Sequence, residues 1–171
     1  MKVVIRESEM QFGEYDKTQV FHMENSEQYT KKLRQNGIKS CEFVLMKGNK
    51  LYFVEAKKSC PNKILAESSK ERKVKYNEFI QDIVTKMKHS LNLYANILLE
   101  RYSIDEVPDA MRNLKNLDMR LVLIVKNAEI KWLMEYQNVF RKELQNEMRI
   151  WKIPDFMILN EDQARKKHFI I

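Results

Sequence analysis

Residues 41–58, CEFVLMKGNKLYFVEAKK, contain two apolar segments separated by Gly48-Asn49, and they decide the fold predicted for this chain. A glycine at the first of two loop positions supplies the positive φ of a tight hairpin turn. Such a turn sets the register of the two strands. It pairs Lys47 with Lys50, Met46 with Leu51, Val44 with Phe53, and Glu42 with Glu55. Two acids therefore face each other at the far end of the hairpin.

Glu42, Glu55 and Lys57 form the candidate site. Residues two apart in a strand share a face, so Glu55 and Lys57 point to the same side. Opposed carboxylates repel each other, and a divalent cation such as Mg²⁺ or Mn²⁺ would hold them together. Lys57 would then orient an attacking water or offset negative charge on a phosphate. These are the parts of a metal-dependent phosphodiesterase; a solvated salt-bridge cluster at the strand ends is the alternative.

The rest of the chain predicts one domain, residues 1–171, because the length suits a single core and only three Gly and three Pro are present. Hydrophobic periodicity predicts an α/β fold with a mixed β-sheet flanked by helices. Ser26 and Gly37 are expected to begin and end the first helix. The expected strands, besides the hairpin, are 2–6, 18–23, 120–125 and 155–159, and the expected helices are 26–35, 66–102, 109–117 and 128–148.

The charge and composition of the chain restrict the kinds of partner that it is expected to bind. The net charge of +7 favours an anionic partner, of which nucleic acid is the commonest, although a basic surface without a specific ligand fits equally. Neither a signal peptide in MKVVIRESEM nor a membrane-spanning apolar run is recognisable, so we expect a cytoplasmic protein without membrane contact. Two Cys and three His share no ligand spacing that suits zinc or a disulfide framework.

The stretch KSCEFVLMKGNKLYFVEAKKS, residues 39–59, resembles the metal-binding hairpin of the PD-(D/E)XK nuclease superfamily. The resemblance covers roughly residues 20–125 and implies a restriction-endonuclease-like αβββαβ core. It implies that Glu42 and Glu55 bind Mg²⁺ or Mn²⁺ and that Lys57 lies near the scissile phosphate. It also implies a metal contact from the Ala56 carbonyl and from a helical glutamate, Glu27 or, after it, Glu24. One departure is Glu42 after Cys41, where the family usually has Asp after Pro.

Basic residues near the hairpin are candidates for binding nucleic acid, DNA ahead of RNA. They are Lys58, at the end of the hairpin, and Lys70, Arg72, Lys73 and Lys75, at the start of the long helix. Such residues neutralise phosphates and make binding fall with salt. A basic first turn is equally well explained as a solvated face, and it opposes the helix dipole.

Three functions follow from these patterns. The first is a metal-dependent nuclease. The second is a catalytically inactive module on the same fold, which binds nucleic acid or a protein partner. The third is an interaction protein with no role on nucleic acid. No specificity domain is recognisable in a chain of this size, so we expect a homodimer or a partner protein to supply targeting.

Overall fold

A computed structural model describes residues 1–171. The strands are β1 (Lys2–Glu7), β2 (Met10–Asp16), β3 (Val20–Phe21), β4 (Phe43–Lys47), β5 (Lys50–Lys57), β6 (Asp118–Val125) and β7 (Phe156–Asn160). The α-helices are α1 (Lys63–Ala66), α2 (Lys70–Leu98), α3 (Ile130–Glu143), α4 (Gln145–Ile150) and α5 (Glu161–Lys166). None of these helices combines the length and the apolar character that crossing a membrane requires.

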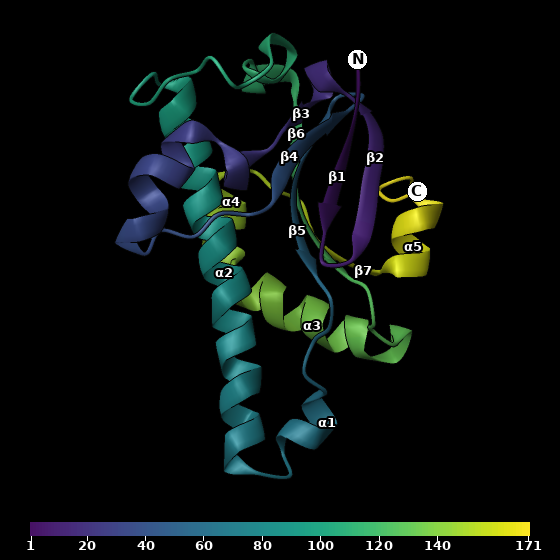
Figure 1. The fold of residues 1–171 in the computed structure, drawn as a ribbon. Helices are drawn as coiled ribbons and strands as arrows, with labels where there is room; N and C mark the ends of the chain where they lie inside the picture. Colours follow the sequence, from purple (N-terminus) through teal and green to yellow (C-terminus); the bar gives the residue numbers. More distant parts are fainter.

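The central sheet is mixed and has five strands in the order β3-β4-β5-β6-β7. β3, β4 and β5 are antiparallel neighbours, whereas β5, β6 and β7 run parallel, with α2 connecting β5 to β6 (Figure 1). Residues 121–125 of β6 are fully buried, as expected for a β-branched strand with both faces covered. β1 and β2 form a separate antiparallel hairpin.

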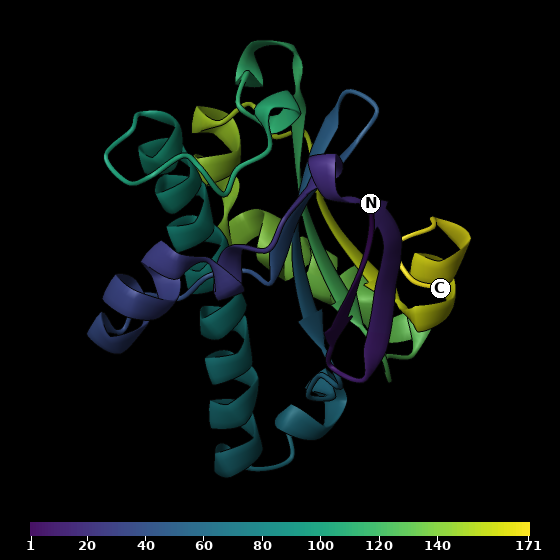
Figure 2. The same cartoon turned by 45° about the horizontal axis from the view of Figure 1, so that its top comes forward.

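The two faces of the sheet are covered differently. Helices α2, α3 and α4 lie on one face, and the β1–β2 hairpin and α5 lie on the other (Figures 1 and 2). Side chains alternate along the hairpin: Val44 and Phe53 pack toward the helices, whereas Phe43 and Val54 pack toward the β1–β2 hairpin. By the same alternation, the charged residues at the end of β5 point toward α2.

The α/β class and the mixed sheet flanked by helices are confirmed, but several predicted boundaries are wrong. The expected helix 66–102 corresponds to α2, which begins later, at Lys70, because Ser69 Oγ caps it by accepting a hydrogen bond from the Arg72 amide, 3.2 Å away. The expected helix 128–148 is divided into α3 and α4. The region 109–117 holds only two short 3-10 turns. The expected strand 18–23 is reduced to the two-residue β3 between two 3-10 turns, and β2 was not predicted.

The predicted helix 26–35 is an irregular segment. A π-helix, Tyr29–Leu33, is followed by a 3-10 turn, Arg34–Asn36. Gly37 ends the segment in the left-handed conformation, φ 75°, as predicted. Ser26 does not cap it, because its hydroxyl donates to the Met23 carbonyl at 2.8 Å instead.

Candidate functional site

The β4–β5 hairpin has the predicted register. Val44 lies opposite Phe53 and Lys47 opposite Lys50, with Gly48 at φ 60° in the turn. The regular ladder ends at the Phe43–Val54 pair, one residue short of the expected pairing of the two acids. The Glu42 amide still donates to the Val54 carbonyl at 3.1 Å, so Glu42 stays beside the end of β5.

Glu55 is the most deeply buried charged residue of the site. It has no exposed surface, and its Oε1 accepts from Lys86 Nζ at 2.8 Å and lies 3.2 Å from Lys57 Nζ. Lys86 Nζ also lies 3.8 Å from Glu42 Oε1. The Lys86 ammonium of α2 thus lies between the two acids of the hairpin, where the sequence predicted a metal.

Burial and the neighbouring charges have opposite effects on the pKa values of Glu55 and Lys86. Burial raises the pKa of the Glu55 carboxyl, and the ammonium groups of Lys86 and Lys57 oppose that rise. Burial alone would lower the pKa of Lys86, but the carboxylates of Glu55, Glu42 and Glu24 raise it. Because the ammonium lies 2.8 Å from Glu55, we describe this contact as an ion pair.

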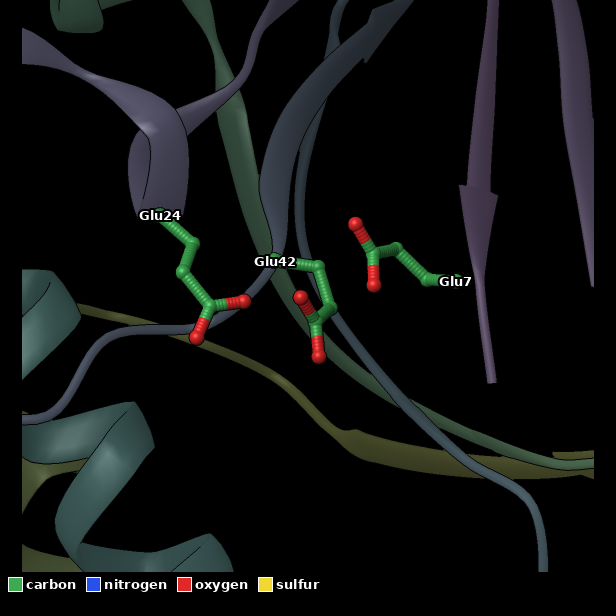
Figure 3. A group of neighbouring side chains, drawn as sticks. All are labelled: Glu7, Glu24 and Glu42. Atoms are coloured by element: carbon green, nitrogen blue, oxygen red, sulfur yellow. The ribbon is translucent and has the colours of Figure 1, made fainter. Parts of the chain in front are cut away.

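Two further acids, Glu7 and Glu24, lie beside Glu42. One carboxylate oxygen from each of Glu7, Glu24 and Glu42 lies within 4.8 Å of the other two. Figure 3 shows Glu42 between Glu7, which comes from β1, and Glu24, which comes from the 3-10 turn Met23–Asn25. The Glu24 amide donates to the Glu42 carbonyl at 3.2 Å, and this bond fixes the turn beside the hairpin.

This crowding changes the protonation of the three acids. Burial, the adjoining Glu24 carboxyl and the charge of Glu55 together raise the pKa of Glu42 to about 10. Burial also raises the pKa of Glu7, and the charge of Glu24 adds to that rise. For Glu24, burial is outweighed by its contact with Glu42 and by Lys86, so its pKa is lowered. A proton held on Glu42 thus relieves the repulsion among the three acids.

Several polar atoms of the site have no partner. Oε2 of Glu42 and Oε2 of Glu55 are buried and make no hydrogen bond. Leaving a buried carboxylate oxygen unsatisfied costs free energy, so such atoms in a folded protein point to a ligand or to stored strain.

Lys57 has a second partner in α2. Its Nζ lies 3.1 Å from Asp82 Oδ2, and burial of Asp82 is outweighed by Lys39 and Lys57, which lower the pKa of that carboxyl. Asp82, Lys86 and Ser90 form a stripe along α2 with a spacing of four residues, and Ser90 Oγ accepts from the Cys41 amide at 2.7 Å. This stripe was not predicted; its signal in the sequence is three polar residues at helical spacing beside the apolar positions Ile83 and Met87.

The structure does not bring Glu27 to the site. Glu27 is exposed, its carboxylate pairs with Lys31 at 2.5 Å, and its amide donates to Glu106. Glu27, the first candidate for the helical acid, therefore lies outside the site, and Glu24, the second candidate, lies in it, because the Glu24 amide bonds to the Glu42 carbonyl. Glu7 was missed entirely, since nothing local in the sequence places β1 beside Glu42.

The other predicted residues lie around the site or away from it. The Ala56 carbonyl accepts a hydrogen bond from Ser8 Oγ at 3.0 Å. Lys58 pairs with Glu9, and Glu9 also lies 3.4 Å from Lys126. The basic residues at the start of α2 are exposed and distant from the hairpin acids: Lys73 precedes Lys86 by 13 residues, which corresponds to about 20 Å along the helix. Lys70, Arg72 and Lys75 lie on the same exposed turns.

Comparison of the chain with models of protein families, with curated proteins and with solved structures finds no match.

Proposed function

We propose that the protein is a metal-dependent nuclease that hydrolyses phosphodiester bonds of nucleic acid. The observation that carries the proposal is the convergence of Glu42, Glu55 and Lys57 on one side of the hairpin, with buried carboxylate oxygens that lack partners. Structural acids are normally paired or hydrogen-bonded when buried, and clustered acids with raised pKa values are typical of functional sites.

The donor set fits a hard divalent cation. Glu42 and Glu55 would hold Mg²⁺ or Mn²⁺, with the Ala56 carbonyl beside them, since these ions prefer carboxylate and carbonyl oxygens. When bound, the ion would supply a water activated for attack on phosphorus. Lys57 would orient that water or stabilise charge on the phosphate, once released from Asp82, which holds its ammonium at 3.1 Å. Lys86 would have to leave the space between the two acids.

The order of elements supports a likeness to the restriction-endonuclease-like core. Three antiparallel strands, β3, β4 and β5, are followed by α2 and the parallel strand β6, which agrees with the βββαβ part of αβββαβ. The departure is the irregular helical segment, which lies between β3 and β4 instead of before the three strands. Glu24, in the turn that follows β3, takes the place expected for the helical acid.

A cleavage assay tests the proposal. Double-stranded DNA, single-stranded DNA and RNA are incubated with the protein in Mn²⁺, in Mg²⁺ and in EDTA. We expect DNA cleavage that needs the metal and falls about 100-fold or more in Lys57→Ala and in Glu55→Gln, the loss typical of removing one group that stabilises the transition state. Lys50→Ala, exposed at the other end of β5, is the matched control and should cleave normally. Full activity in both site variants would exclude this site.

Lys86 favours a second candidate function, an inactive module that binds nucleic acid or a protein partner. Its ammonium already compensates Glu55 at 2.8 Å and Glu42 at 3.8 Å without any metal. For such a module we expect salt-sensitive binding of nucleic acid in EDTA, no cleavage in either metal, and unchanged affinity in Glu55→Gln. Binding that requires the divalent metal would instead favour the nuclease.

A further inference from the structure

The acidic cluster Glu7–Glu24–Glu42 contains Glu42, the hairpin acid that Lys86 also contacts. Its members come from three separate segments: β1, the 3-10 turn Met23–Asn25, and the residue before β4. One oxygen from each lies within 4.8 Å of the others, and the three side chains point toward one another (Figure 3). The fold therefore assembles three carboxylates from distant parts of the sequence.

The cluster shares its main counter-charge, the Lys86 ammonium, with Glu55. Lys86 contacts Glu42 only through Oε1, at 3.8 Å, and makes its closer bond to Glu55. The nearest other basic group is His22, whose Nε2 lies 3.6 Å from Glu7 Oε1. Glu42 is only 6% exposed, and its Oε2 has no hydrogen-bond partner. A buried, unpartnered carboxylate oxygen between two other acids is the donor arrangement that a cation satisfies.

We propose that Glu7, Glu24 and Glu42 form a divalent-cation site of their own, suited to Mg²⁺ or Mn²⁺. Three carboxylate oxygens, with water in the remaining positions, match the ligand preference of these ions. Glu42 is shared between this site and the pair that it forms with Glu55. This site would add a second cation position to the centre of the proposed nuclease. Binding of a cation there does not depend on whether the protein hydrolyses nucleic acid.

The β1–β2 turn holds Glu7 in place. Ser8, the next residue, donates its hydroxyl to the Ala56 carbonyl at 3.0 Å, and Glu9 pairs with Lys58 and lies 3.4 Å from Lys126. The turn is thus fixed to the ends of β5 and β6 by two consecutive residues. This anchoring makes Glu7 a built-in ligand and gives the N-terminal hairpin a role in the site.

Mn²⁺ binding to the full chain, measured by calorimetry and by the electron paramagnetic resonance of free Mn²⁺, tests the proposal. We expect wild-type protein to bind Mn²⁺ and Glu7→Gln to bind it about tenfold more weakly or worse, since even the loss of a group that only orients a metal ligand costs that much. Glu14→Gln is the matched control, because Glu14 is exposed in β2 of the same hairpin and lies outside the cluster, and this variant should bind as the wild type does. Circular dichroism checks that each variant is folded.

Glu55→Gln separates this site from the proposed catalytic pair. Mn²⁺ binding that survives Glu55→Gln but is weakened by Glu7→Gln supports the three-acid site, whatever the outcome of the cleavage assay. Equal Mn²⁺ affinity in Glu7→Gln and the wild type would overturn the proposal, as would a wild-type protein that binds no Mn²⁺. If Glu55→Gln loses Mn²⁺ binding and Glu7→Gln keeps it, the three-acid site is overturned and the nuclease proposal still stands.

Discussion

Glu42 is destabilising for the metal-free protein at neutral pH. Its pKa is raised to about 10, from an ordinary value of 4.5, by burial and by its acidic neighbours. A carboxyl with a raised folded-state pKa stabilises the fold fully below its unfolded pKa, and this contribution is lost as the pH rises toward the folded pKa. Keeping such a residue is typical of sites that trade stability for function.

The substitution Glu42→Gln should therefore stabilise the protein in EDTA. We expect a gain in unfolding free energy on the order of 1–3 kcal/mol at about pH 8 and a much smaller gain at about pH 5, because Glu42 must take up a proton on folding at pH 8 whereas glutamine is already uncharged. Urea denaturation at the two pH values measures both differences. Glu9→Gln, an exposed acid with a lowered pKa, should show no such gain. The same advantage at both pH values would contradict the assigned ionisation of Glu42.

At this scale the sequence predicts neighbours along strands and misses neighbours across the fold. Glu55 and Lys57 share a face because of strand geometry, and the Gly48-Asn49 turn brings Glu42 beside them. Lys86 lies 31 residues from Glu55 in the chain, and its contact depends on how α2 packs against the sheet. No local pattern fixes that packing.

At the scale of elements, the N-terminal hairpin was the largest omission. Its turn places Ser8 at φ 50° and Glu9 at φ 61°, and neither residue type signals a left-handed conformation as Gly or Asn would. The break between α1 and α2 was predictable, in contrast, because Asn62 and Ser69 each cap the helix that follows.

The exposed first turns of α2 extend away from the sheet and carry the predicted phosphate contacts (Figure 1). Replacing Lys70, Arg72 and Lys73 with Gln should weaken DNA binding and reduce the slope of log affinity against log salt by about one per lost phosphate contact. Fluorescence anisotropy over a series of salt concentrations measures this slope. The matched control replaces Arg165, Lys166 and Lys167, exposed on or just after α5. Equal slopes for the two triple variants would show that α2 is only a solvated face.

At the scale of the whole molecule, the sequence predicted the layers but not what covers each face. The mixed sheet follows from the hairpin, the buried strand β6 and the helical connections. Covering the second face with the β1–β2 hairpin and α5 brings Glu7 to the site, and that arrangement depends on long-range contacts among Phe12, Phe43 and Phe169. The candidate centre thus lies where the β1–β2 turn, the end of β5 and the middle of α2 meet.

The central claim is that Glu42 binds a divalent cation. A crystal of the protein soaked in Mn²⁺, measured at a wavelength where manganese scatters anomalously, tests it most directly. We predict an anomalous peak about 2.0–2.2 Å from a Glu42 carboxylate oxygen, toward Glu55 for the catalytic pair or toward Glu7 and Glu24 for the three-acid site. No peak beside Glu42, with Lys86 still bonded to Glu55, would contradict it.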